Sequence, residues 1–152
     1  MRRTIATLAV ALSIVGCSSS SLSTGGDTQT ISNAAGQTVE VTLQRVIDPA
    51  TDTEELGAGN RYVAVEFSVK NASTEPFTET SPDSDAVLIT TASDDPVTAD
   101  LHEVSDCEPF EDDVSELPPG ETLTGCATFE IPEDAELERF QYYFSNVASF
   151  EL

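Results

Sequence analysis

Residues Arg61–Asn71, with the sequence RYVAVEFSVKN, decide the fold. Apolar side chains occupy every second position, which gives the stretch a period of two. Because successive side chains of a strand point to opposite faces, this pattern predicts a β-strand with one buried row. A shift of one residue would bury Glu66 and Lys70 instead, so the pattern also defines the register. The expected buried row comprises Val63, Val65, Phe67 and Val69.

Shorter segments of similar character lie on both sides of this strand, separated by turns rich in glycine, proline and aspartate. After Cys17 no stretch of ten residues has a strong apolar period of 3.6, which argues against long helices. Several short strands joined by such turns are typical of an antiparallel β-sandwich. We therefore predict one all-β domain of about seven strands over residues 37–152. The other expected strands are 37–44, 86–91, 97–104, 121–131, 138–145 and a terminal edge at 150–152.

The first sixteen residues have the layout of a secretory signal: Arg2 and Arg3, then an apolar stretch, then a small residue before a cleavage point. This stretch is shorter than the roughly 20 apolar residues of a membrane-spanning helix. The run Ile14-Val-Gly-Cys17 resembles the lipobox of prokaryotic lipoproteins. The resemblance implies that residues 1–16 are a signal peptide and that Cys17 receives lipid.

The expected product is a lipid-anchored protein on the extracytoplasmic side of the cell membrane, because two acyl chains together anchor a protein stably. Residues 17–36 are small and polar and carry few large apolar groups. We expect them to form a flexible tether between the lipidated Cys17 and the folded domain.

The chain is strongly acidic, with 28 Asp and Glu against six Lys and Arg in 152 residues and a net charge of −22. Nucleic-acid binding needs clustered Lys and Arg, and the sequence has no such cluster, so nucleic acid is excluded as a partner. A halophilic source and an actinobacterial source both fit this acidity, and so does a solvated surface without any specific partner.

Three cysteines are an odd number for an exported protein. If lipid modifies Cys17, Cys107 and Cys126 remain as a pair, which should be oxidised outside the cytoplasm. The disulfide would close the loop between them and stabilise the fold by about 3 kcal/mol on the chain-entropy estimate. Neither cysteine lies in a Cys-x-x-Cys motif, so a structural disulfide is expected and a redox-active one is not.

The loop between these cysteines is the main candidate for an ion site. Residues 103–116 read EVSDCEPFEDDVSE, and clustered carboxylates on a closed loop can supply several of the six to eight oxygens that calcium takes. The spacing departs from that of a dedicated calcium loop, so a calcium site and a solvated acidic face both remain open. The candidate ligands are Asp106, Glu108, Glu111, Asp112, Asp113 and Glu116.

Catalytic chemistry finds little support. His102 is the only histidine, whereas nucleophilic catalysis needs a base beside its nucleophile and zinc sites draw on several His or Cys ligands. Paired carboxylates could hydrolyse glycosides, but the chain has no tryptophan and a small acidic sandwich rarely offers a deep cleft. We expect no catalytic residues and no cofactor apart from the calcium considered above.

Two segments resemble a known family. Arg61–Asn71 matches a characteristic strand whose asparagine opens the next turn, and Leu117–Gly125 (LPPGETLTG) with Phe129–Pro132 matches a second element. These segments resemble the immunoglobulin-like "domain of unknown function 4352" of prokaryotic surface lipoproteins, which is similar in fold to mycobacterial immunoprotective secreted antigens. The resemblance implies an immunoglobulin-like fold and brings no catalytic residue with it.

These observations favour a membrane-anchored extracytoplasmic lipoprotein with a non-enzymatic interaction domain. Its expected contacts are the membrane, through lipid on Cys17, and another envelope protein or surface component, through a sheet face, loops or strand edges. Two alternatives remain, a calcium-binding module that uses residues 103–116 and, less favoured, a small hydrolase.

Overall fold

The structure, a computed structural model, describes residues 20–22, 26–51, 57–78, 81–100, 104–111 and 116–152. The expected signal peptide and Cys17 lie outside these residues. Within the described part of the chain, no helix is long and apolar enough to span a membrane.

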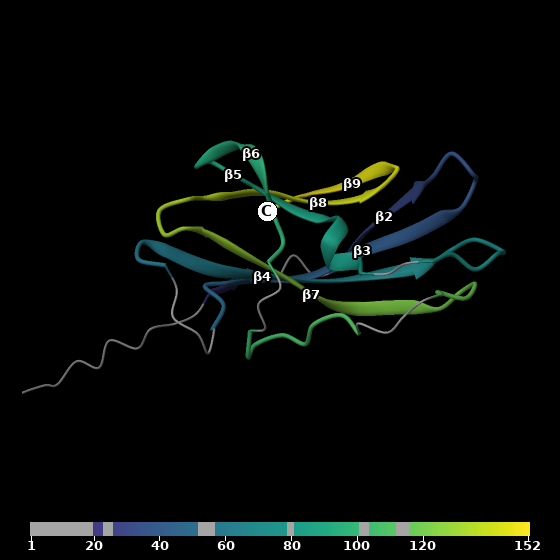
Figure 1. Ribbon diagram of the computed structural model, residues 1–152, viewed down its shortest axis with the longest axis horizontal. Helices are drawn as coiled ribbons and strands as arrows, with labels where there is room; N and C mark the ends of the chain where they lie inside the picture. Colours follow the sequence, from purple (N-terminus) through teal and green to yellow (C-terminus); the bar gives the residue numbers. More distant parts are fainter. Residues whose placement is uncertain (1–19, 23–25, 52–56, 79–80, 101–103, 112–115) are drawn as a thin grey trace, which may run out of the picture.

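Two antiparallel sheets pack face to face in a β-sandwich (Figure 1), as the alternating sequence predicts. The larger sheet has the order β1-β3-β4-β7, and β2 also pairs with β3. Its strands are β1 (Ser20–Leu22), β2 (Asp27–Ser32), β3 (Thr38–Asp48), β4 (Asn60–Asn71) and β7 (Thr122–Pro132). The smaller sheet has the order β6-β5-β8-β9. Its strands are β5 (Ala86–Thr90), β6 (Ser93–Thr98), β8 (Leu137–Phe144) and β9 (Asn146–Glu151), and the 3-10 turn η1 (Pro82–Asp85) precedes β5.

The strand that decides the fold, β4, lies between β3 and β7 and carries the predicted row into the space between the sheets. Val63, Val65, Phe67 and Val69 are all fully buried. The ring of Phe67 lies 5.0 Å from that of Phe140 on the opposing sheet, in the tilted geometry that aromatic pairs prefer. This row confirms the predicted register.

The opposite side of β4 differs from the prediction of a half-buried strand. Tyr62 and Ala64, which point away from the main core, are also buried. They belong to a second, smaller cluster with Val104 and both cysteines, so a distant loop covers the first half of β4. Glu66 and Lys70, further along this face, are only partly buried.

The prediction of a flexible tether over residues 17–36 is wrong where strands form, at residues 20–22 and 27–32. Residues 27–32 form β2, which pairs with β3 over its whole length, and residues 20–22 pair with β3 as β1. The sequence DTQTIS has one large apolar residue, Ile31, which is buried. Backbone pairing with an existing strand orders this polar segment, so little hydrophobic burial of its own is needed.

The structure contains nine strands in its described part, rather than about seven, because β1 and β2 join the larger sheet. The strand expected at 97–104 lies instead at β6, where Pro96 is tolerated since β6 is an edge strand. After β6 the chain crosses to the larger sheet, where Asp100 bridges Thr128 on β7.

Asn71 ends β4 and opens the turn that follows, as the resemblance implies. Its side chain is fully buried, and its Nδ2 donates to the carbonyls of Glu75 and Leu117, each at 2.9 Å. Its Oδ1 accepts from the backbone N–H of Ser73 at 2.8 Å. These bonds join the loop after β4 to the segment before β7, where Gly120 adopts a positive φ of 83° that glycine permits without strain.

Candidate functional site

The loop that carries the two predicted cysteines wraps around the edge of β7. A disulfide joins Cys107 to Cys126, whose Cα atoms are 6.1 Å apart, on the outer face of the larger sheet. Three residues later Phe110 enters the main core and packs on Phe67 with ring centroids 4.8 Å apart. Between them, the carbonyl of Glu108 accepts the N–H of Cys126 at 3.0 Å.

Gly125 permits this close contact. A Cβ atom at Gly125 would lie 2.7 Å from both the backbone N and the ring Cγ of Phe110, closer than any real Cβ contact. The loop therefore holds β7 from both sides, with the disulfide outside and the Phe110 ring inside. Both cysteines therefore have a structural role, since their disulfide fixes the loop to β7.

The acidic residues predicted as calcium ligands do not converge within the described part of the loop. Asp106 accepts the backbone N–H of Thr51 at 2.8 Å, and its carbonyl accepts from Arg45 Nη2 at 3.0 Å. The Thr51 hydrogen bond, with a contribution from Arg45, lowers the pKa of the exposed Asp106 carboxyl. Asp106 thus acts here as a capping group that joins two loops.

The other predicted ligands are exposed or lie outside the described residues. Glu108, Glu111 and Glu116 are exposed, and Asp112 and Asp113 fall in the segment 112–115 that the structure does not describe. Among the described residues, no group of three or more His, Cys, Asp or Glu side chains is placed to hold a metal ion. Calcium binding by this loop therefore stays a prediction.

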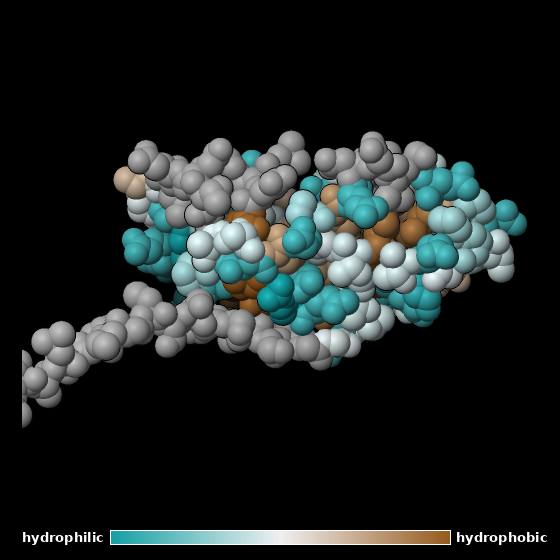
Figure 2. All heavy atoms as spheres, turned by 90° about the horizontal axis from the view of Figure 1, so that it is seen from below, coloured by the Kyte–Doolittle hydropathy of each residue, from teal (hydrophilic) through white to brown (hydrophobic). Residues whose placement is uncertain are grey.

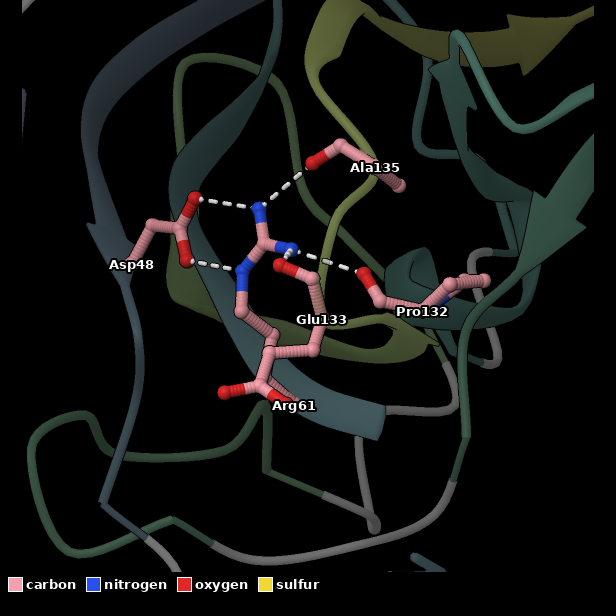
Figure 3. A network of polar contacts seen from close by, with 5 residues as sticks. All are labelled: Asp48, Arg61, Pro132, Glu133 and Ala135. Atoms are coloured by element: carbon pink, nitrogen blue, oxygen red, sulfur yellow. Dashed lines mark hydrogen bonds and ion pairs between the residues drawn. The ribbon is translucent and has the colours of Figure 1, made fainter. Parts of the chain in front are cut away.

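The most complete polar network surrounds Arg61 at the start of β4 (Figure 3). Its Nε and Nη2 donate to the two carboxylate oxygens of Asp48 at 2.7 and 3.0 Å. The guanidinium also donates to the carbonyls of Pro132, Glu133 and Ala135 at 2.7 to 2.8 Å. The hydrogen bond to Asp48 raises the pKa of Arg61 against partial burial, which lowers it. Both side chains are fully engaged, so this network is a structural clamp between β3, β4 and the turn after β7.

The hollows on the described surface include two open ones, and neither gathers catalytic groups among the described residues. One, of about 340 Å³, lies at the turn between β5 and β6 and is lined by residues 89–94 with Glu138 and Arg139. The other, of about 600 Å³, lies where the chain leaves β6, beside Asn60 and Glu130. No histidine or cysteine among the described residues lines either hollow, and His102 lies outside the described residues.

Three of the described strand edges carry features that oppose pairing with a partner over part of their length. At β9, the side-chain amide of Gln29 donates to the carbonyl of Ser149 and accepts its N–H at 3.0 Å, in place of a neighbouring strand. At β7, bridges from Asp100 and Pro109 occupy part of the edge. The edge strand β6 carries Pro96 and two aspartates, which are features that oppose strand addition.

The outward face of the smaller sheet is different in character, and we name it the outer sheet face. Its residues alternate with the buried ones of β5, β8 and β9, and only two of the eight, Arg139 and Glu151, carry a formal charge at neutral pH. Tyr143 and Val147, directly opposite each other in the ladder, are the two large hydrophobic side chains described as exposed, each at 41%. The outer sheet face comprises Val87, Ile89, Arg139, Gln141, Tyr143, Val147, Ser149 and Glu151.

Polar contacts within the outer sheet face hold its side chains in place. The Tyr143 hydroxyl donates to Gln141 Oε1 at 3.1 Å, and Gln141 Nε2 donates to the Ser149 hydroxyl at 3.3 Å. The outward face of the larger sheet is more polar. In Figure 2, which shows the molecule from that side, hydrophilic residues dominate and hydrophobic patches lie between them. On its outward face Glu40 pairs with Lys70, and Glu66 pairs with Arg45.

The fold and this surface define an all-β sandwich with a filled core and an exposed, weakly charged sheet face. A family model described as "Domain of unknown function (DUF4352)" matches residues 26–149. The chain belongs to this family, which confirms the resemblance carried by Arg61–Asn71 and Leu117–Gly125. The match also begins one residue before β2, in agreement with the corrected domain boundary.

A solved structure of low sequence identity shows the same fold. A functionally unknown protein from Listeria monocytogenes EGD-e matches with a TM-score of 0.50 and 15% identity, over 84% of this chain and 88% of that one. An uncharacterized beta-sandwich protein from Clostridium difficile 630 matches with a TM-score of 0.46 and 13% identity, over 82% and 89%. No curated protein matches the sequence.

Proposed function

We propose that this protein is a lipid-anchored extracytoplasmic lipoprotein whose sandwich is a non-enzymatic interaction domain. The observation that carries the interaction role is the outer sheet face, on which Tyr143 and Val147 are exposed side by side. Aromatic residues are enriched at protein interfaces, where charged residues are depleted from the centre. A weakly charged face in a chain of net charge −22 fits this description.

The non-enzymatic part of the proposal rests on what the described surface contains. The core between the sheets is filled by large side chains such as Phe67, Phe129 and Tyr142, and the two hollows are open to solvent. An active site typically gathers a nucleophile or titratable groups around a pocket. Here the strongest polar network, around Arg61, has every donor engaged by the protein itself.

Anchoring is tested by a Cys17→Ser variant expressed in a bacterial host that processes lipoproteins. The unaltered chain should sediment with membranes and gain the mass of its acyl chains, and Cys17→Ser should lose that mass and leave the membrane fraction. A chain that stays soluble in both forms would refute the anchor.

Binding through the outer sheet face is tested in the same cells with a photo-crosslinking residue in place of Val147. The matched control places the same residue at Thr124, which is exposed on the outward face of β7. A discrete cross-linked product from position 147 but not from 124, lost when Tyr143→Glu is added, supports the interaction role. Equal products from both positions would contradict it.

A further inference from the structure

A polar hollow adjoins the outer sheet face at the turn between β5 and β6. Ile89 and Arg139 belong to both, so the hollow continues the face without a break. Its volume of about 340 Å³ lies within the range of small-molecule sites, roughly 300–1,000 Å³. The face and the hollow can therefore hold one ligand together.

Irregular pairing of β5 accompanies the hollow. Toward β8 the register shifts between Ile89 and Thr90, which leaves Glu138 without an opposite residue. Toward β6 it shifts again, so that residues 94–96 lie opposite Ile89 alone. Bulges of this kind re-aim side chains and are frequent beside functional sites. Residues from both irregular stretches, Asp94 and Glu138, line the hollow.

The side chains that line the hollow offer both donors and acceptors of hydrogen bonds. Arg139 contributes a guanidinium, Ser93 contributes a hydroxyl, and Asp94 and Glu138 contribute carboxylates. The ion pairs formed among the described residues include none of these charged groups, which leaves them available to a ligand. A sugar ring matches such a lining, because each of its hydroxyl groups both donates and accepts hydrogen bonds.

The centre of the outer sheet face continues this pattern with uncharged groups. Gln141 lies at the centre, between Val87 and Ser149 in the two ladders of β8. Its side-chain amide accepts from the Tyr143 hydroxyl and donates to the Ser149 hydroxyl, so three polar groups are held in place. A ligand that binds to such groups loses less free energy to the ordering of side chains.

Tyr143 supplies an exposed aromatic ring at the end of the face away from the hollow. It follows Arg139 by four residues on β8, which is about 13 Å along a strand. The C–H bonds of a pyranose ring stack well on an aromatic ring, because the faces of that ring carry partial negative charge. A chain of linked sugar rings can therefore reach from the stacking position at Tyr143 to the hydrogen-bonding hollow at Arg139.

The charges of this surface disfavour polyanionic partners. Arg139 faces Glu151 across the ladder between β8 and β9, so the two formal charges of the outer sheet face balance. The hollow adds the carboxylates of Asp94 and Glu138, and the whole chain has a net charge of −22. A polymer rich in phosphate or carboxylate is repelled by such a field, whereas an uncharged polymer is not.

We propose that the outer sheet face and the adjoining hollow bind an uncharged polysaccharide, with one sugar ring stacked on Tyr143 and another hydrogen-bonded in the hollow beside Arg139. Gln141 and Ser149 contact the sugar chain between these two positions. This inference rests on the proposed function and names the class of partner that its interaction surface takes.

The test measures binding of the full chain to an array of printed oligosaccharides, in a detergent without a sugar headgroup. The array carries neutral hexasaccharides of glucose, mannose, xylose and N-acetylglucosamine, and a hexasaccharide of galacturonic acid as the polyanion. The chain should bind at least one neutral hexasaccharide and should not bind the galacturonate. Absence of binding to every neutral hexasaccharide, or equal binding to the galacturonate, would overturn the proposal.

Variants of Tyr143 separate ring stacking from general apolar contact. Tyr143→Phe keeps the aromatic ring and should bind within about threefold of the wild type, whereas Tyr143→Leu keeps a large apolar side chain but should bind about tenfold more weakly or worse. The matched control is Thr124→Ala, a substitution at an exposed position of β7, which should leave binding unchanged. Equal binding by Tyr143→Leu and the wild type would contradict the stacking position.

Arg139→Met tests the hollow, because it removes the hydrogen-bond donors and keeps an apolar side chain of similar length. Binding should weaken about fivefold or more, and unchanged binding would overturn the role of the hollow. If no sugar binds while the cross-link from position 147 persists as a discrete product, the partner is a protein. The proposed function then stands without the polysaccharide.

Discussion

The Arg61 clamp should be the most costly ion pair to remove, because it is the most buried and the most fully hydrogen-bonded. The Arg61 and Asp48 side chains are only 17% and 15% exposed, and the guanidinium makes five hydrogen bonds. Arg61→Ala leaves the Asp48 carboxylate partly buried without its cation and frees three carbonyls. Breaking a buried pair costs about 3–5 kcal/mol, and the residual exposure favours the lower end, about 3 kcal/mol.

The matched control is Lys70→Ala. Lys70 pairs with Glu40 in the same sheet, but their side chains are 45% and 36% exposed, and exposed pairs contribute about 0–1 kcal/mol. Arg61→Lys keeps the charge but loses the planar fork that reaches Asp48 and the carbonyls together. We expect it to recover less than half of the loss.

Urea unfolding at pH 7 and fixed salt measures these changes as free energies of unfolding. The pKa of Arg61 is raised from an already high value, so the clamp is charged throughout the neutral range. Asp48→Ala combined with Arg61→Ala should cost less than the sum of the single changes, since neither charge is then left unpaired. A cost for Arg61→Ala no larger than that for Lys70→Ala would refute the reasoning.

Three further predictions concern the loop around β7. Gly125→Ala should destabilise the fold by about 1–3 kcal/mol, because its Cβ meets the Phe110 backbone at 2.7 Å; a melting temperature unchanged from that of the wild type would contradict the close contact. Asp106→Asn should change how the free energy of unfolding depends on pH under acidic conditions. The Thr51 hydrogen bond lowers the pKa of Asp106 in the folded state. The stabilisation that follows from this shift is therefore present above the unfolded-state pKa of about 3.9 and is lost as the pH falls through the folded-state pKa. The difference in unfolding free energy between wild type and variant should shrink below pH 4, and a constant difference would count against that hydrogen bond. Millimolar calcium should raise the melting temperature at constant ionic strength only if residues 103–116 bind it, and an equal rise with magnesium or sodium would reduce the effect to screening.

The alternation in Arg61–Asn71 was sufficient to predict the central strand because its information is local. The period of two needs no knowledge of the rest of the chain, and the same holds for β3, β7 and β8. The strand β2 could not be found in this way. Its sequence is polar, and what orders it is the free edge of β3 and the contact of Gln29 with Ser149, both of which exist only after folding.

The burial of Tyr62 and Ala64 on β4 and the exposure of the outer sheet face also depend on non-local contacts. Tyr62 and Ala64 are buried because the loop with Val104 and Cys107 crosses them. Tyr143 and Val147 are exposed because no equivalent loop among the described residues covers the smaller sheet. A sequence pattern shows which residues share a face, but it does not show whether another part of the chain will cover that face.

The entry of the chain along β3 has a mechanical consequence. Ser20 pairs with Asp48 and Leu22 with Val46, so β1 enters the sheet at the end of β3 that carries Asp48. Cys17 precedes Ser20 by three residues in the sequence, and three residues of extended chain span at most about 11 Å. If Cys17 is anchored to a membrane as proposed, a pull between the bilayer and a bound partner would act along the axis of β1. Its hydrogen bonds would then be loaded in shear, so that they share the force instead of opening one by one.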